Sequence, residues 1–188
     1  YWLLEEAKLQ RQPKEKPLSR KVALVTGSGG GIGRAIAEKL IDEGANVVFT
    51  DISEDYLQEA TQSYHTDQAI GCHCDVTSAK SIEGAIQKAS LQFGGLDIIV
   101  HSAGLAISKP LADTTEGDWN ILQDVLVKGQ FLLSKAAASL MKKQNMGGSI
   151  INIVSKNGLV SGPNNAGYGT AKAAQLHLSR LLASELAP

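Results

Sequence analysis

Three side chains near the end of the chain have the types and spacing needed to exchange a proton with a bound molecule. Tyr168 and Lys172 are four residues apart, which places both side chains on one face of a helix. A free tyrosine titrates at about 10, and a neighbouring ammonium favours its phenolate. Ser155 could donate a hydrogen bond to the substrate oxygen as charge develops there. The alternative is an exposed Tyr/Lys pair with no chemical role.

A glycine-rich segment near the start of the chain could bind a phosphate. The residues TGSGGGIGRAI begin at Thr26 and follow an apolar run that is typical of a strand. Gly27 and Gly31 would let the backbone turn and approach a pyrophosphate, and Gly33 would let a helix pack close to the sheet. The helix amino terminus near Ile32 would supply free N–H groups. A flexible, glycine-rich surface loop is the alternative.

Asp51 could select the cofactor that binds at this turn. It closes the next apolar run, about 20 residues beyond the glycine segment. A carboxylate there can accept hydrogen bonds from the ribose hydroxyls of NAD and would repel the 2′-phosphate of NADP. This favours NAD as the cofactor. Alternatively, Asp51 caps the helix that follows, although Ser53 could do so instead.

The elements that must position these residues alternate between strands and helices. Apolar runs rich in β-branched residues predict strands at 21–26, 46–51, 69–74, 97–103 and 148–155. Helical patterns lie at about 32–43, 53–63, 78–93, 116–145 and 166–187. This alternation predicts an α/β fold, a doubly wound, Rossmann-like parallel sheet of strand order 3-2-1-4-5 with ligands at the carboxyl ends of its strands. The fifth strand would then be an apolar edge, so we expect a further strand beyond Pro188 in the natural protein.

Length and composition indicate one globular domain preceded by a short arm. The chain has 188 residues, of which 43% are hydrophobic and 20% charged. Residues 1–20 are polar and contain prolines, so we expect an arm or linker there and a dinucleotide-binding domain at 21–188. The net charge of −1 gives no general attraction to nucleic acid or to an anionic membrane. Because no apolar stretch is long enough to span a bilayer, we expect a cytoplasmic protein.

Two cysteines flank a histidine in the third predicted strand. Cys72, His73 and Cys74 are all potential zinc ligands. In a strand, however, the two cysteines point to one face and the histidine to the other, and no second ligand pair follows. We therefore expect two buried thiols and no metal site.

Taken together, these motifs resemble those of the short-chain dehydrogenase/reductase family. Residues 26–33 match the family pattern TGxxxGIG, and residues 168–172 match YxxxK with Ser155 upstream. The resemblance covers nearly all of the chain and implies Ser155, Tyr168 and Lys172 as catalytic residues. It also implies that Tyr168 and Lys172 contact the cofactor, because the family lysine holds the nicotinamide ribose.

The resemblance implies further contacts to the cofactor. Asp75 and Val76 match the family's acidic position beside the adenine. The sequence HSAG at 101–104 stands where the family usually has Asn-Asn-Ala-Gly, so two amides are replaced. Ala103 and Gly104 would still let this loop lie against the cofactor.

One departure from the family pattern affects the proposed chemistry. The family usually has an asparagine where this chain has Leu126, and that asparagine helps hold a water in the proton relay from the lysine. A leucine side chain cannot do so, although its backbone carbonyl can. The sequence therefore leaves two functions open. One is an NAD-dependent oxidoreductase for a small hydroxyl or carbonyl substrate, and the other is a catalytically weak NAD-binding module kept for assembly or regulation.

The arm and two local variants suggest a longer protein. The arm resembles the junction in bacterial fusions of a rhamnulose-1-phosphate aldolase with a short-chain dehydrogenase, and so do the variants DVL at 124–126 and SKNG at 155–158. This resemblance implies an aldolase domain on the N-terminal side and lactaldehyde as the substrate. The alternative is an arm that packs on its own domain.

The fourth and fifth predicted helices carry more apolar residues than one sheet face should need. These residues are Ile121, Leu122, Leu132, Leu133, Leu178, Leu181 and Leu182. Members of the family commonly pair through these two helices. We therefore expect a homodimer or homotetramer. We also expect the protein to bind a small-molecule substrate.

Overall fold

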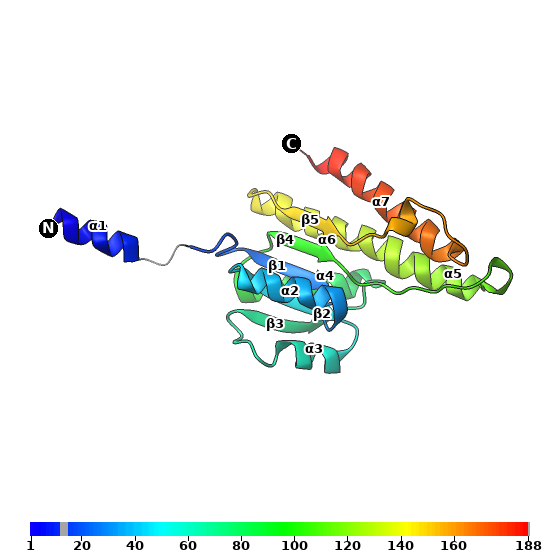
Figure 1. Cartoon of the computed structure of the whole chain (residues 1–188), viewed down its shortest axis with the longest axis horizontal. Coiled ribbons are helices and arrows are strands. Elements are labelled where there is room, and N and C mark those ends of the chain that lie inside the picture. The colour runs from blue at the N-terminus through cyan, green and yellow to red at the C-terminus, as the bar shows by residue number, and fades with distance from the viewer. Residues whose placement is uncertain (12–14, 188) are drawn as a thin grey trace.

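The computed structural model describes residues 1–11 and 15–187 and contains a five-stranded sheet (Figure 1). Its strands are β1 (Val22–Thr26), β2 (Asn46–Asp51), β3 (Ala69–His73), β4 (Ile98–His101) and β5 (Ser149–Asn152). Neighbouring strands are parallel, and their order is β3-β2-β1-β4-β5. This order confirms the predicted doubly wound sheet.

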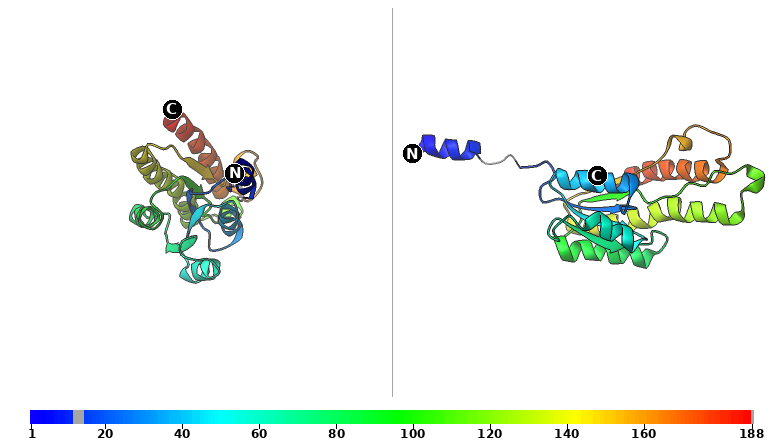
Figure 2. Two further views of the ribbon diagram at one scale, coloured as in Figure 1. Left: turned by 90° about the vertical axis from the view of Figure 1, so that its left-hand side faces the viewer. Right: turned by 60° about the horizontal axis from the view of Figure 1, so that its bottom comes forward.

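Helices cover both faces of the sheet because successive side chains of a strand point to opposite faces. The helices are α1 (Trp2–Arg11), α2 (Gly31–Asp42), α3 (Glu54–Thr61), α4 (Ala79–Phe93), α5 (Glu116–Leu122), α6 (Gly129–Gln144) and α7 (Ala166–Leu186). Val22 and Leu24 of β1 belong to the core that packs with α4 and α6. Ala23 and Val25 belong to the core that packs with α2 and α3 on the other face. Figure 2 shows these helices arranged around the sheet.

The arm forms a helix that lies apart from the sheet. Figures 1 and 2 show α1 on the far side of the connecting segment, away from the layers of the domain. The side chains of Tyr1, Trp2, Leu3 and Leu4 are all exposed. In this structure the apolar end of the arm therefore does not pack on the sheet domain.

The helical segment predicted at 116–145 is interrupted by a turn of π-helix. The turn η2 (Gln123–Lys128) separates α5 from α6. The N–H of Gly129 donates to the carbonyl of Asp124, five residues earlier, where an α-helix would pair residues four apart. Leu126 lies inside this turn and is fully buried. The prediction of one regular helix here is wrong, because hydrophobic periodicity does not reveal a one-residue change of pairing.

The two cysteines differ from the predicted pair of buried thiols. Cys72 is only partly buried because β3 is the edge strand of the sheet, and Cys74 lies just beyond the end of that strand. Cys74 is buried in the core, and burial raises the pKa of its thiol to about 12. Within residues 1–11 and 15–187, no group of three His, Cys, Asp or Glu side chains is placed to hold a metal ion. No helix in the same ranges is long and apolar enough to cross a membrane.

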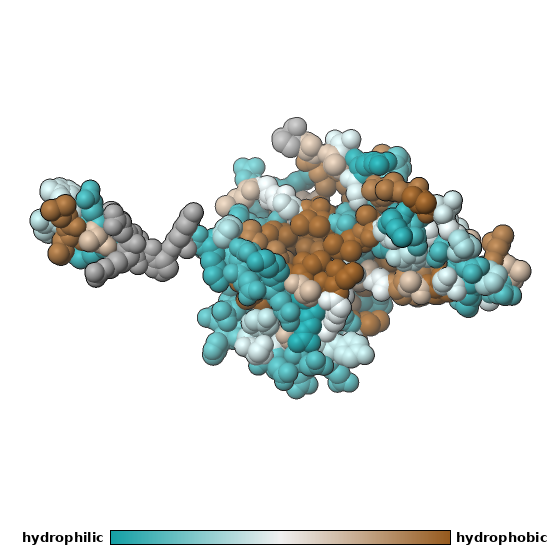
Figure 3. Space-filling model, in the orientation of Figure 1, coloured by the Kyte–Doolittle hydropathy of each residue, from teal (hydrophilic) through white to brown (hydrophobic). Residues whose placement is uncertain are grey.

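Part of the apolar surface expected on the helices belongs to the core instead. Leu122 and Leu133 are buried within this chain, so neither can contact a second copy. Ile121 and Leu181 are exposed. At the edge of the sheet, the side chain of Ile151 in β5 is 45% exposed. Figure 3 shows apolar residues gathered in the middle of the face in view.

Candidate active site

The predicted site residues gather where the parallel strands end. β1 leads into the glycine turn, β2 ends at Asp51, and β4 leads into the loop that contains Ala103 and Gly104. β5 is followed, three residues after its end, by Ser155. Because the strands are parallel, these four connections lie at one edge of the sheet.

The glycine turn has the shape that a pyrophosphate requires. Gly27 and Gly31 both have positive φ, at 64° and 55°. A Cβ on Gly27 would lie 2.6 Å from the Cα of Ala103, and a Cβ on Gly33 would overlap the carbonyl oxygen of Gly27. These glycines therefore allow β1, α2 and the loop after β4 to meet without side chains between them.

The amino terminus of α2 is open to an anion. The helix has neither a side-chain cap nor an acidic residue in its first turn, so its N–H groups and positive dipole end face outward. A Cβ on Gly31 would meet no atom within 4 Å, and the adjoining Ile32 is 65% exposed. A dinucleotide pyrophosphate fits this combination of free donors, open space and apolar contact.

Asp51 lies against the glycine turn. Its Oδ2 accepts a hydrogen bond of 3.1 Å from the N–H of Gly29, and its Oδ1 accepts one of 3.1 Å from the N–H of Ser53. The N-cap of α3 is Ser53, whose hydroxyl accepts from the N–H of Tyr56. A carboxylate can accept additional hydrogen bonds beyond these two, so Asp51 retains capacity for ribose hydroxyls.

Asp75 and Val76 have clear structural contacts of their own. One carboxylate oxygen of Asp75 accepts from both the N–H and the hydroxyl of Thr77, each at 2.8 Å. Val76 is buried and packs beside Gly129, where a Cβ would approach the valine side chain to 3.1 Å. These contacts hold the loop after β3 in place at the same edge of the sheet.

Lys172 is held between its own helix and the end of β5. Its Nζ donates a hydrogen bond of 3.0 Å to the carbonyl of Ile153 and lies 5.7 Å from the centre of the Tyr168 ring. The residue is buried, and this burial lowers the pKa of the ammonium. A lowered pKa makes the release of a proton from Lys172 easier.

Ser155 is brought beside the same helix by a short turn. Its Oγ accepts from the N–H of Asn157 at 3.2 Å and begins the turn η3 (Lys156–Gly158). A Cβ on Gly158 would lie 2.7 Å from the backbone of Lys172, so this turn rests directly on α7. The fold therefore brings the elements that carry Ser155, Tyr168 and Lys172 together.

A threonine hydroxyl organises the loop after β4. The Oγ1 of Thr26 accepts hydrogen bonds from the N–H groups of Ser102 and Ala103 at 3.2 and 3.1 Å. The next residue, Gly104, faces Leu126, because a Cβ on this glycine would lie 3.0 Å from a methyl group of the leucine. The loop is thereby tied to the glycine turn on one side and to the π-helical turn on the other.

Gln175 is a residue of this region that the sequence analysis missed. Its Nε2 donates a hydrogen bond of 2.7 Å to the backbone carbonyl of Leu126, and both residues are fully buried. The available signal was a polar stripe on α7, because Tyr168, Lys172, Gln175 and Ser179 recur at helical spacing. The side chain of Leu126 has no amide, but an amide from α7 thus contacts its backbone carbonyl.

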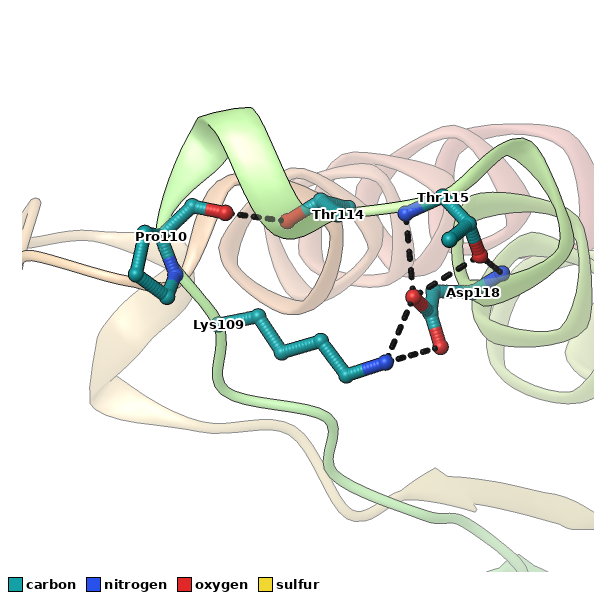
Figure 4. A network of polar contacts seen from close by, with 5 residues as sticks. All are labelled: Lys109, Pro110, Thr114, Thr115 and Asp118. Atoms are coloured by element: carbon teal, nitrogen blue, oxygen red, sulfur yellow. Dashed lines mark hydrogen bonds and ion pairs between the residues drawn. The ribbon is translucent and has the colours of Figure 1, made fainter.

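An ion pair fastens the loop between β4 and α5 beside the site. Both carboxylate oxygens of Asp118 accept from the Nζ of Lys109, at 2.8 and 2.9 Å, and Asp118 also forms a capping box with Thr115 (Figure 4). These hydrogen bonds lower the pKa of Asp118 to about 2. The N–H of Lys109 donates to the carbonyl of Asn164, just before α7. The loop is therefore fastened to both neighbouring elements.

The site combines a glycine turn with a buried lysine and its neighbouring tyrosine. A comparison of the whole sequence with known protein families agrees with this arrangement. A family model described as short chain dehydrogenase matches residues 21–188. The chain belongs to the short-chain dehydrogenase family. Members of this family are oxidoreductases that generally bind a nicotinamide cofactor, either NAD or NADP.

Named relatives and solved structures agree with this family. The chain is 40% identical over 98% of its length to the uncharacterized oxidoreductase YuxG of Bacillus subtilis (strain 168), of which it spans 27%. It is 37% identical over 90% of its length to the uncharacterized oxidoreductase SAR2567 of Staphylococcus aureus (strain MRSA252), of which it spans 73%.

Two solved structures have the same fold as this short-chain dehydrogenase. A short-chain type dehydrogenase/reductase from Mycobacterium marinum superposes with a TM-score of 0.86 at 34% identity, covering 91% of this chain and 71% of that one. A short chain dehydrogenase from Mycobacterium smegmatis gives 0.87 at 32% identity, covering 95% and 78%. The core of the fold and the order of its elements are therefore those of the family.

Proposed function

We propose that this short-chain dehydrogenase uses NAD to interconvert a small hydroxyl compound and its carbonyl. The observation that carries the proposal is the position of Lys172, whose ammonium is buried against the carbonyl of Ile153 and beside the Tyr168 ring. A buried cation next to a phenol favours the phenolate that a general base must provide. The nicotinamide, when bound, would accept or return the hydride.

The residues of this chain would move the proton and hold the substrate. In the direction of oxidation, the phenolate oxygen of Tyr168 takes the hydroxyl proton of the substrate as its carbon loses hydride. The hydroxyl of Ser155 donates a hydrogen bond to the same substrate oxygen and stabilises its negative charge. Lys172 places its positive charge beside the Tyr168 ring. In the direction of reduction, Tyr168 returns the proton.

The preference for NAD over NADP rests on Asp51. Its carboxylate lies against Gly29 in the glycine turn and carries negative charge at the end of β2. A 2′-phosphate placed near this carboxylate would be repelled, whereas a ribose hydroxyl could donate to it. Two backbone N–H groups hold the carboxylate in this place beside the glycine turn, and this supports the assignment.

A scan of small alcohols and aldehydes with NAD and NADP would test the proposed function. Reaction is followed at the nicotinamide absorbance band, with the Tyr168→Phe variant as the blank. We expect turnover of at least one substrate with NAD and a weaker reaction with NADP. A preference for NADP with every active substrate would contradict the cofactor assignment.

A second candidate is an NAD-binding module with little turnover. The observation that favours it is Leu126, whose side chain packs with Leu122 and Ala171 in a small apolar cluster and offers no polar group. Leu126→Asn distinguishes the two functions. If the backbone carbonyl suffices, this variant changes the rate little; if the amide is needed, turnover rises by up to about 10²–10⁴-fold. Melting temperature is measured in parallel, because an unpaired buried amide costs about 1–3 kcal/mol.

We further propose that the chain belongs to a longer protein that carries an aldolase domain before it and that acts on lactaldehyde. The match to YuxG includes nearly all of this chain, arm included, yet the chain spans only 27% of that protein. The exposed apolar side chains at the start of α1 suit contact with a preceding domain. We expect lactaldehyde to be turned over with a higher kcat/KM than propanal, which lacks the hydroxyl group on carbon 2. Equal values would contradict the substrate assignment.

A further inference from the structure

The imidazole of His101 is buried at the end of β4, and the chemistry proposed above does not use it. The side chain is 1% exposed, whereas those of His65, His73 and His177 are all exposed. In the sheet, His101 stands beside Thr26 of β1 and Asn152 of β5. A histidine enclosed on all sides has to place both ring nitrogens against suitable partners.

The hydroxyl of Thr26 determines which ring nitrogen carries the proton. Its oxygen accepts from the N–H groups of Ser102 and Ala103, which uses both lone pairs. Its own proton can then go only to the Nδ1 of His101, at 3.3 Å, or to the carbonyl of Val100, at 3.5 Å. A protonated Nδ1 would meet an oxygen with no lone pair left. The neutral ring therefore carries its proton on Nε2.

The Nε2 end of the ring is the one left over by Thr26. This nitrogen is buried and forms no well-aligned hydrogen bond within the part of the chain that the structure describes. The backbone carbonyl of Leu126 nevertheless acts on the ring as a hydrogen-bond acceptor, and the charge of Lys172 opposes its protonation. Lys172 is also linked to His101 through one residue, because the N–H of Ile153 donates to the carbonyl of His101 at 2.9 Å and its carbonyl accepts from Lys172.

The imidazole of His101 has the charge state that a neutral hydrogen-bond donor requires. Burial, followed by the charge of Lys172, lowers the pKa of His101 to about 4. The imidazole is therefore neutral at neutral pH and does not compete with Lys172 as a second cation.

We propose that His101 is a positioning residue of the proton relay, whose Nε2–H holds the backbone oxygen of Leu126 in place beside the ammonium of Lys172. This inference rests on the proposed function. A carbonyl oxygen has two lone pairs, so that of Leu126 can accept from Nε2–H and from the side-chain amide of Gln175 together. The imidazole would supply from β4 the polar contact that the side chain of Leu126 lacks. Gln175 would keep the Leu126 carbonyl in position through its 2.7 Å hydrogen bond.

The tautomer is tested without substrate or cofactor. Nitrogen-15 NMR of the whole chain, with His101→Asn used to assign the signal, reports the protonated ring nitrogen at neutral pH. We expect the Nε2–H form. The Nδ1–H form or a charged ring would overturn the proposal, whether or not the protein turns over any substrate.

The role in the relay is tested by kinetics of a protein with a confirmed substrate. His101→Leu should lower kcat at least about 10-fold, within the range of acid–base effects, while KM and NADH binding change less than twofold. His101→Gln, which restores a donor, should recover part of kcat, and His177→Leu on the exposed face of α7 should behave as the parent.

The two His101 variants together separate this role from simple packing. Unchanged kcat in a folded His101→Leu protein, or equal losses in His101→Leu and His101→Gln, would overturn the proposal. A parent chain that binds NADH but turns over no substrate would instead refute the proposed function and leave the tautomer measurement as the test of His101.

Discussion

At the scale of single residues, Tyr168 is expected to carry the proton. Tyr168→Phe removes one oxygen and little volume, so it should leave NADH affinity nearly unchanged and lower turnover by about 10²–10⁴-fold. Steady-state kinetics measures the loss of turnover, and fluorescence titration measures the affinity for NADH. Tyr64→Phe is the matched control, because Tyr64 stacks on Phe49 in the core away from the site. Parent activity in the Tyr168 variant would rule out its role as acid and base.

Asp51 is expected to set the choice of dinucleotide through its charge. Asp51→Asn keeps an acceptor for the N–H of Gly29 but removes the negative charge that opposes a 2′-phosphate. The ratio of NADP to NAD dissociation constants should therefore fall several-fold. Calorimetric titration with both nucleotides measures this ratio, and Asp55→Asn on the exposed side of α3 is the control. An unchanged ratio would mean that Asp51 serves only the local backbone.

His101 should make the fold sensitive to mild acid. Its pKa of about 4 in the folded chain lies below the ordinary value near about 6.5, so between these values the unfolded chain binds a proton that the folded chain does not. The free energy of unfolding is therefore complete above about pH 6.5 and falls towards pH 4, by at most about 3 kcal/mol. Urea unfolding across this pH range should show the loss, and His101→Asn should reduce it. The same pH slope in both proteins would contradict this expectation.

At the scale of elements, the loop between β4 and α5 depends on one cross-link. Lys109→Met removes the ion pair with Asp118 and leaves the capping box of Thr115 intact. We expect faster proteolysis of the loop and a higher KM with a smaller change in kcat, because the loop borders the site without carrying the proposed chemistry. Lys128→Met, which breaks the exposed pair with Asp124, is the matched control. Equal proteolysis of the two variants would show that the cross-link does not hold the loop.

The same cross-link should persist in acid. The pKa of Asp118, about 2, lies below the ordinary carboxyl value near about 4. Its contribution is therefore complete above about pH 4 and is lost only as the pH falls towards 2. Acid proteolysis with an enzyme active in this range would show protection of the loop until that point.

At the scale of the whole molecule, we expect a homodimer or homotetramer formed through α6 and α7. Phe131 and Leu181 expose apolar side chains on these helices, although Leu122 and Leu133 are committed to the core. Phe131→Asp with Leu181→Asp should shift the protein towards monomer in sedimentation at micromolar concentration. Leu91→Asp on α4, also exposed, is the control. A parent protein that is monomeric at these concentrations would contradict this expectation.

Much of the fold and the main site residues follow from local pattern. Alternating strand and helix signals, the glycines at 27, 31 and 33, and the spacing of Tyr168 and Lys172 each depend on neighbours in the chain. The observed strand order agrees with those patterns. The fold also brings together the elements that carry Ser155, Tyr168 and Lys172. Local sequence determines these features because a periodic apolar face and a required positive φ admit few residue types.

Only the tertiary structure decides how the departure at Leu126 is accommodated. The amide that reaches its carbonyl comes from Gln175, 49 residues later, and the π-helical turn that presents it has no signature in the apolar pattern. The proton position on His101 likewise depends on Thr26, 75 residues earlier, and on the two N–H groups that fill its oxygen. Such contacts join elements through their packing, so no spacing along the chain can encode them. The physical reason is that a buried polar atom is satisfied by whichever group the fold brings within hydrogen-bond distance.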